Sequence, residues 1–239
     1  MKPSCAWASS CATVMSVPEA RGPETRGTVA AGPWDVRLAR ALVRPLRHTP
    51  LTPNELTTLG LLASLVAAWL MASGDPRRAA LGGGLFMLAV LVDHMDGEFA
   101  RLTGLTSRLG HYYDHVAAGL GYVSLFAGLG IGLQSGWLGA WAAVAGTIAA
   151  GSIAAIFLIR VFLEETAGRA MVAQESWRGF EPEDALYLVG PVAWLGLLGP
   201  FLLAAAFGAP LFLLWVVWCA VTQRSATASP AKSSAKGAV

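Results

Sequence analysis

The sequence predicts an all-α, polytopic membrane protein with six transmembrane helices and an N-terminal interfacial amphipathic helix. Of its 239 residues, 55% are hydrophobic and only 13% are charged, whereas an ordinary soluble domain has about 25% charged residues. Apolar runs of roughly 17–25 residues, the length that crosses a hydrocarbon layer of about 30 Å, recur between short polar turns. Composition and run length together place the chain in the membrane class.

Composition along the chain predicts four segments. Residues 1–30 are rich in Ser, Pro, Gly, Ala and Thr and lack the apolar core of a secretory signal, so we expect a disordered tail. Within residues 31–50, arginines recur every three or four positions among apolar side chains, which favours a basic amphipathic helix lying against anionic headgroups. A solvated surface helix is the alternative. Residues 51–222 form the membrane domain, and residues 223–239 form a second disordered tail.

The membrane domain divides into apolar runs that we interpret as helices. The first begins near Leu51, where Thr52 is placed to cap it and Pro53 suits its first turn. The next three cover about 79–100, 109–133 and 137–163. After a charged loop, residues 183–222 are apolar enough for two shorter crossings, with Gly-Pro at 199–200 and Ala-Pro at 209–210 offering turns or kinks.

The positions of Lys and Arg predict the orientation. Six crossings place both termini on one side of the membrane together with the 101–108 and 164–182 loops, and that side holds fifteen of the seventeen Lys and Arg residues. By the positive-inside rule this side is cytoplasmic. We therefore expect a multi-pass protein of the cytoplasmic membrane with both termini inside. A net charge of +2 without a basic run gives no reason to expect nucleic acid as a partner.

Three carboxylates interrupt otherwise apolar runs. Asp93 and Asp96 are three residues apart and share a helix face, and Asp114 lies near the start of the next run. A charge within a membrane-length segment costs at least about 2.5–3.5 kcal/mol, which by default marks a functional site. Converging acids without nearby lysines favour a divalent cation such as Mg²⁺ or Mn²⁺. An ion-coupled transporter is a rival class, although its acids would lie near mid-membrane.

These acids belong to a longer pattern, Asp93-x2-Asp96-Gly97-x2-Ala100-Arg101-x8-Gly110-x3-Asp114. The pattern resembles the signature of the CDP-alcohol phosphatidyltransferases, which is D-x2-D-G-x2-A-R-x8-G-x3-D-x3-D. Seven fixed residues match at their offsets, and the last position departs, because this chain has Ala118 in place of the fourth aspartate. A Pro53-Asn54-x2-Thr57 element before the motif is a second, weaker match.

The resemblance implies transfer of a phosphatidyl or similar group from a CDP-linked lipid such as CDP-diacylglycerol to a small alcohol acceptor, with release of CMP. It also implies metal binding by the three aspartates, a site at the cytoplasmic side among membrane lipids, and a homodimer. The residues expected at the nucleotide are Asn54, Thr57, Gly97, Ala100, Arg101, Ser107 and Gly110. Helix capping or packing stays open for Asn54, Thr57 and Ser107, and headgroup anchoring for Arg101.

The missing aspartate is the one that the family implies as base for the acceptor hydroxyl, and losing a base costs about 10²–10⁴ in rate. His115 is the expected replacement and His111 the next, since a neutral imidazole suits this task at physiological pH. A different polar residue such as Asp184 is an alternative. So is a degenerate family member that binds metal and nucleotide without turnover. Arg160 is expected to bind the acceptor, unless it only reaches toward the headgroups; the acceptor's identity stays open.

Overall fold

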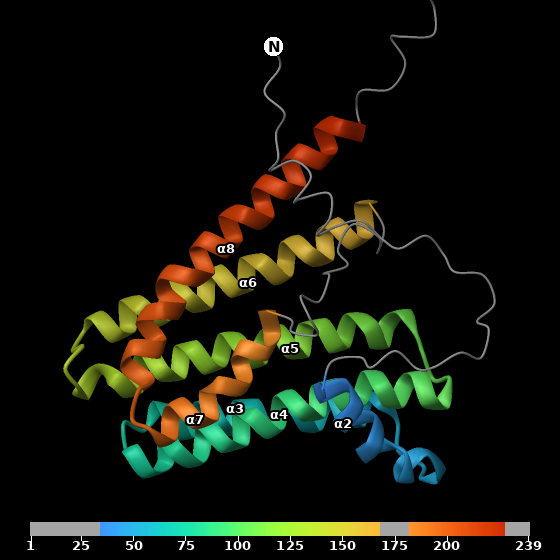
Figure 1. Ribbon diagram of the computed structural model, residues 1–239, viewed down its shortest axis with the longest axis horizontal. Helices are drawn as coiled ribbons and strands as arrows, with labels where there is room; N and C mark the ends of the chain where they lie inside the picture. The colour runs from blue at the N-terminus through green and yellow to red at the C-terminus, as the bar shows by residue number, and fades with distance from the viewer. Residues whose placement is uncertain (1–33, 168–181, 228–239) are drawn as a thin grey trace, which may run out of the picture.

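The structure, a computed structural model, describes residues 34–167 and 182–227, which form helices joined by short turns (Figure 1). In chain order the elements are α2 (Trp34–Val43), η1 (Pro45–His48), α3 (Pro53–Ala72), α4 (Pro76–Thr103), α5 (Arg108–Gly132), η2 (Leu133–Ser135), α6 (Trp141–Ala167), η4 (Pro182–Leu188), α7 (Val189–Trp194) and α8 (Leu198–Thr227). The described residues contain no strand, so the all-α class is confirmed.

Helix α5 packs closely between α3 and α6, and glycines make this possible. A Cβ added at Gly128 or Gly132 of α5 would collide with backbone atoms of α3, at Ala68 and Met71 respectively. On the opposite side, a Cβ added at Gly146 of α6 would lie 2.7 Å from the Cα of Gly130. Small residues let transmembrane helices approach in this way, and packing rather than hydrophobic burial holds such helices together.

The turn between α4 and α5 brings the two halves of the acidic motif side by side. Gly104 ends α4 with a positive φ of 72°, a conformation that residues with a Cβ disfavour. Ser107 then caps α5 by accepting a hydrogen bond from the backbone N–H of Gly110 at 2.9 Å. The predicted capping role of Ser107 is therefore present. Because the two helices run in opposite directions (Figure 1), the end of α4 lies beside the start of α5.

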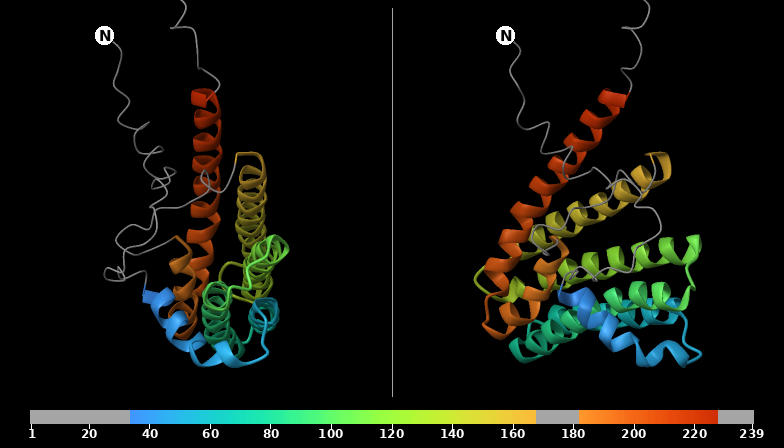
Figure 2. Two further views of the ribbon diagram at one scale, coloured as in Figure 1. Left: turned by 90° about the vertical axis from the view of Figure 1, so that its right-hand side faces the viewer. Right: turned by 45° about the vertical axis from the view of Figure 1, so that its right-hand side comes forward.

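Helix α2 lies across α4 on the outside of the bundle, as both views in Figure 2 show. It ends at Val43, before Pro45, because a proline ring disfavours continuation of a helix. Ala39 and Val43 are buried, whereas Trp34, Leu38 and Leu42, spaced four residues apart, are exposed. The position of α2 at a membrane surface stays a prediction.

The C-terminal part of the membrane domain differs from the two crossings predicted over 183–222. Five helices of the described residues are long and apolar enough to span a membrane, and Ala185–Trp194 is a shorter apolar stretch. The chain breaks at Gly196, with a φ of 71°, and not at either proline pair. Pro200 falls in the first turn of α8, where proline is tolerated. Helix α8 continues through Pro210, because a membrane helix can absorb one lost hydrogen bond.

The predicted ends of the chain are only partly covered. Helix α8 extends to Thr227, five residues into the segment 223–239 that was predicted as a tail. The predicted tail over residues 1–30 and the remainder of the C-terminal one lie outside the described residues. Helices α4 and α6 each run a few residues beyond their predicted C-terminal ends.

Candidate active site

The three predicted aspartates converge. Side-chain oxygens of Asp93 and Asp96 on α4 and of Asp114 on α5 all lie within 4.8 Å of one another. Asp96 is buried and the other two are half-buried. Like charges this close repel strongly in an apolar environment, and carboxylate oxygens are the ligands that Mg²⁺ and Mn²⁺ prefer. The residues present therefore fit a divalent cation.

Thr57 orients Asp96 from the neighbouring helix α3. Its hydroxyl lies 2.5 Å from Oδ2 of Asp96 and 3.1 Å from the carbonyl oxygen of Pro53. Both side chains are buried, with 4% and 3% of the residue surface exposed. A buried carboxylate that accepts a hydroxyl hydrogen bond has a fixed direction, so Thr57 contributes to the geometry of the acidic cluster.

A cavity of about 710 Å³ opens beside the acids, between α3, α4, α5 and the end of α6. Its volume is within the range of small-molecule sites. Asp96 and Asp114 lie on its wall. All the residues predicted to contact the nucleotide line it: Asn54, Thr57, Gly97, Ala100, Arg101, Ser107 and Gly110. The structure thus gathers the whole predicted nucleotide set around one opening.

Gly110 lines this cavity at a position where neighbouring side chains leave no room for a Cβ. A Cβ added there would lie 2.9 Å from Oγ of Ser107 and 3.1 Å from Oδ1 of Asn54. The capping serine and the asparagine therefore occupy the space that a side chain would need. The absence of a Cβ at Gly110 therefore lets Asn54 and Ser107 pack against the first turn of α5.

Arg101 faces the carboxylate of Glu98, which is not part of the sequence motif. Its Nε and Nη2 donate to Oε1 of Glu98 at 3.0 and 2.7 Å. The other oxygen of Glu98 accepts from Nε of Arg40, on α2, at 2.8 Å. The Glu98 side chain is only 4% exposed, whereas that of Arg101 is 62% exposed. The hydrogen bond and the negative charge of Glu98 raise the pKa of the Arg40 guanidinium above its usual value.

A histidine–carboxylate contact also fastens α2 to the same stretch of α4. Nε2 of His94 lies 3.0 Å from Oδ2 of the buried Asp35, and Nδ1 of His94 lies 3.4 Å from the hydroxyl of Tyr187. The ring of Tyr187 packs on Trp34, with 5.1 Å between ring centroids. The motif histidine His94 therefore serves the docking of α2, a role that the sequence pattern did not suggest.

Both histidines predicted as replacement bases lie beside Asp114. Ring nitrogens of His111 and His115 and a carboxylate oxygen of Asp114 lie within 4.8 Å of one another. Nε2 of His111 is 2.8 Å from Oε1 of Glu164 on α6. Nδ1 of His115 is 3.1 Å from the carbonyl oxygen of His111. His111 lines the large cavity, and His115 is not among its lining residues.

Ala118, at the position of the absent fourth aspartate, faces a small gap beside Asp93. It lines a cavity of about 10 Å³ together with Asp93, Ser64 and Tyr122. That volume is about the minimum for one water molecule. The short side chain of Ala118 therefore leaves a gap, with polar groups around it, next to the proposed metal ligand Asp93.

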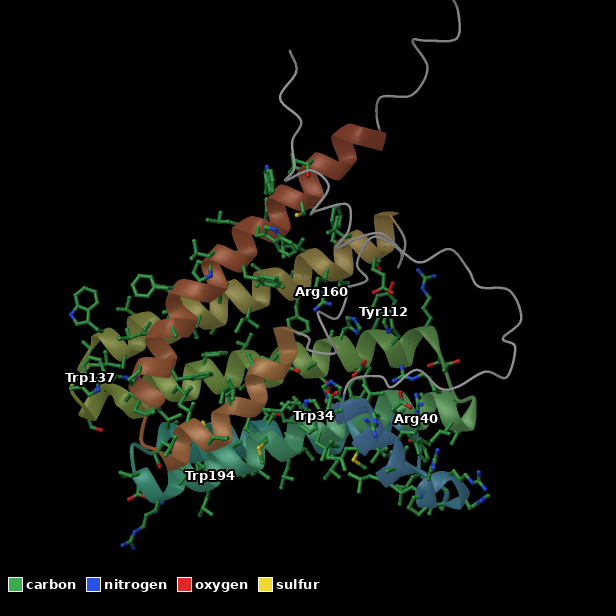
Figure 3. All side chains as sticks on the ribbon, viewed as in Figure 1. Trp34, Arg40, Tyr112, Trp137, Arg160 and Trp194 are labelled. Carbon is green, nitrogen blue, oxygen red and sulfur yellow. The ribbon has the colours of Figure 1, made fainter. Side chains whose placement is uncertain are left out.

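Arg160 is not brought to the acidic cavity. It lines a different, mainly apolar cavity of about 360 Å³ between α5, α6, η4 and α8, and Figure 3 shows it on α6. Acceptor binding by Arg160 stays a prediction. The side chain of Asp184, the alternative base, lies outside the described residues.

Membrane-length helices with a cluster of acids beside a cavity define a membrane protein with a candidate metal-binding site. Residues 50–223 match the sequence profile described as CDP-alcohol phosphatidyltransferase, which is more than half of the chain. The chain belongs to this family of phospholipid-synthesis transferases, so the resemblance drawn from the motif is confirmed.

Two curated relatives match part of the chain. Over 87 residues it is 34% identical to the bifunctional IPC transferase and DIPP synthase of Rubrobacter xylanophilus, covering 36% of this chain and 19% of that protein. Over 94 residues it is 29% identical to the archaetidylinositol phosphate synthase of Pyrococcus horikoshii, covering 39% of this chain and 48% of that protein. The chain therefore spans less than half the length of these relatives.

A solved structure shares the fold. The crystal structure of Mycobacterium tuberculosis phosphatidylinositol phosphate synthase (PgsA1), with CDP-DAG bound, matches with a TM-score of 0.58 and 22% sequence identity. The match covers 85% of this chain and 100% of that one. At this level of identity the likeness shows the arrangement of helices alone.

Proposed function

We propose that this protein transfers a phosphatidyl or similarly substituted phosphate from a CDP-linked lipid, such as CDP-diacylglycerol, to a small alcohol and releases CMP. The observation that carries the proposal is the convergence of Asp93, Asp96 and Asp114, within 4.8 Å, beside the cavity that the predicted nucleotide residues line. The names of two similar proteins, an archaetidylinositol phosphate synthase and a phosphatidylinositol phosphate synthase, favour inositol phosphate as the acceptor.

The three aspartates are the proposed ligands of Mg²⁺ or Mn²⁺, which would neutralise the donor diphosphate and the departing CMP. Thr57 holds Asp96 in a fixed direction through its hydroxyl. Asn54 and Ser107 offer polar groups at the cavity wall, and Gly97 lets a ribose or phosphate approach the backbone. Positioning and charge stabilisation of this kind carry most of the catalysis in phosphoryl transfer.

His115 is the proposed base for the acceptor hydroxyl. A carbonyl oxygen only accepts hydrogen bonds, so the contact between Nδ1 of His115 and the carbonyl of His111 assigns the proton of a neutral imidazole to Nδ1. Nε2 is then the basic nitrogen and takes the proton. His111, whose Nε2 is engaged by Glu164, is the alternative.

The proposed site faces the cytoplasm, where the soluble CMP is released, and the donor enters from the lipid. This orientation rests on the bias of Lys and Arg toward the side that holds the acidic ends of α4 and α5. A homodimer is proposed from the family resemblance alone.

A second function is favoured by Ala118. A relative that binds CDP-linked lipid and metal without turnover would need no base, and the structure has no carboxylate at this position. Such a protein would act by holding the lipid nucleotide and not by consuming it.

The deciding experiment measures CMP release by the purified protein in lipid nanodiscs containing CDP-diacylglycerol, with Mg²⁺ and a panel of alcohols that includes inositol phosphate. We expect release to stop on chelation and to return with Mg²⁺ or Mn²⁺. Asp96→Asn should reduce release by about 10²-fold or more. The same substitution at Asp75, the cap at the opposite end of α4, should not. Metal-dependent binding without release from any alcohol would favour the non-catalytic function, and neither binding nor release would reject both.

A further inference from the structure

Glu98 is a buried carboxylate held between two arginines that come from different helices. Arg40 of α2 binds Oε2 at 2.8 Å, and Arg101 of α4 binds Oε1 through two nitrogens at 2.7 and 3.0 Å. Each arginine thus has its own oxygen. A buried carboxylate without a cation is strongly unfavourable, so at least one of the two arginines has to stay.

The two arginines differ in how firmly they are held. Arg40 belongs to a helix that is docked by the Asp35–His94 contact at 3.0 Å, and Val43, three residues further on, packs with Phe99 in a buried cluster. Figure 3 shows Arg40 on α2 at the end of the molecule where Tyr112 lies. Its charged group therefore stays close to Glu98.

Arg101 is placed to move. Its side chain is 62% exposed, it lines the large cavity, and its guanidinium lies next to Gly97, where an added Cβ would come within 3.4 Å of Nη2. Among the described residues, the side-chain partner that holds its guanidinium is Glu98. An anionic phosphate can accept the same two parallel hydrogen bonds that the carboxylate accepts now.

We propose that Arg40 is a positioning residue that keeps Glu98 neutralised while Arg101 turns from Glu98 to a phosphate of the bound nucleotide. Without Arg40, the buried carboxylate retains Arg101 as its one remaining guanidinium and competes with the ligand for it. Arg40 acts only through Arg101 and touches no substrate. This inference rests on the proposed function, because it requires a phosphorylated nucleotide in the cavity.

The test compares Arg40→Gln, the double variant R40Q/E98Q and the control Arg44→Gln, which removes the same charge from an exposed position one turn further on. The donor KM and kcat for CMP release are measured in nanodiscs, after gel filtration has shown each variant to be monodisperse. We expect R40Q to raise the donor KM about tenfold with kcat nearly unchanged, an effect the size of one charged hydrogen bond. R40Q/E98Q should return the donor KM to near the wild-type value. The control R44Q should have the wild-type donor KM.

Rescue by E98Q separates this role from a merely structural one, because removing a second buried partner would further weaken the docking of α2. A donor KM that R40Q leaves unchanged, or that R40Q/E98Q fails to restore, overturns the inference while the proposed function stands. Arg40→Lys, which keeps the charge, gives a milder variant should R40Q not fold.

Affinity for CDP-diacylglycerol with Mg²⁺ gives a second readout that needs no turnover. If the wild type binds the lipid without releasing CMP, the same ordering of dissociation constants supports the role of Arg40 and contradicts the catalytic proposal. If the wild type neither binds nor turns over CDP-diacylglycerol, both proposals fall together.

Discussion

Asp114 is the residue at which the proposed metal site and the proposed base meet. Its carboxylate lies within 4.8 Å of oxygens of Asp93 and Asp96 on one side and of nitrogens of His111 and His115 on the other. Asp114 Oδ2 is 3.8 Å from Nδ1 of His115. A base on this side of Asp114 would act next to the phosphate that the aspartates position, as the reaction requires.

Replacing His115 by Ala should lower kcat for CMP release by about 10²–10⁴, because the acceptor hydroxyl then loses its base. Adding Ala118→Asp to this variant should restore part of the rate, since the carboxylate would enter the gap beside Asp93. The measurement is CMP release at saturating donor and acceptor. His48→Ala, at an exposed position in η1, is the control. Unchanged turnover in H115A would transfer the role to His111 and Glu164.

At the residue scale the sequence predicted local relations well and distant ones poorly. Asp93 and Asp96 share a helix face whatever the rest of the chain does, so their convergence toward one site could be inferred from spacing. The Arg40–Glu98 and His111–Glu164 pairs join residues that are 58 and 53 positions apart. Such contacts depend on which helices become neighbours, and single-sequence periodicity does not contain that information.

Among the elements, α5 depends most on small residues. Gly128 lies where an added Cβ would meet the carbonyl and Cα of Ala68, which are backbone atoms that cannot rotate away. Gly151, in the apolar helix α6, has open space around the same added atom. The two positions separate the cost of close helix packing from the ordinary effect of replacing glycine in a helix.

Gly128→Ala should therefore destabilise the fold by about 1–3 kcal/mol, the usual cost of overpacking a filled interface. Gly151→Ala should be neutral or slightly stabilising, because alanine has the higher helix propensity. Unfolding of both variants in detergent, followed by circular dichroism against temperature, provides the comparison. Equal stabilities would mean that α3 and α5 are less closely packed than the structure shows.

Prediction at the element scale succeeded where hydropathy alone decides and failed where one backbone conformation decides. The runs that became α3 to α6 were placed to within a few residues because long apolar stretches are unmistakable. In the C-terminal part, two proline pairs were the expected breaks. The break is instead at Gly196, where a positive φ follows the end of α7. The proline pairs in the sequence did not indicate this position.

In the whole molecule, the two ends of the bundle differ in character. Figure 3 places Trp137 and Trp194 at one end and Arg40 and Tyr112 at the other. The second end also carries the acids and the large cavity. Aromatic residues favour the membrane interface, and arginines favour the cytoplasmic side. This difference between the two ends agrees with the predicted orientation. The prediction that both termini lie inside further assumes six membrane crossings.

The crossing count depends on η4 and α7. Pro182–Trp194 spans roughly 20–25 Å at the rises of 3₁₀- and α-helices, short of the hydrocarbon thickness of about 30 Å. Nevertheless, α8 begins beside the α5–α6 connection, since a Cβ added at Gly199 would lie 3.0 Å from Nε1 of Trp137. From there α8 runs back toward the end at which α6 finishes (Figure 1). We therefore expect this short element to complete a sixth pass, with some thinning of the bilayer around it.

Reporter fusions test this count in cells. A fluorescent protein that folds only in the cytoplasm should fluoresce when fused after Val239, and also after Thr106, in the turn between α4 and α5. A phosphatase that is active only outside should work after Ser73, in the turn between α3 and α4. Five passes would put the two termini on opposite sides of the membrane. Phosphatase activity after Val239, together with fluorescence after Thr106, would therefore show that η4 and α7 enter the membrane and return to the same side.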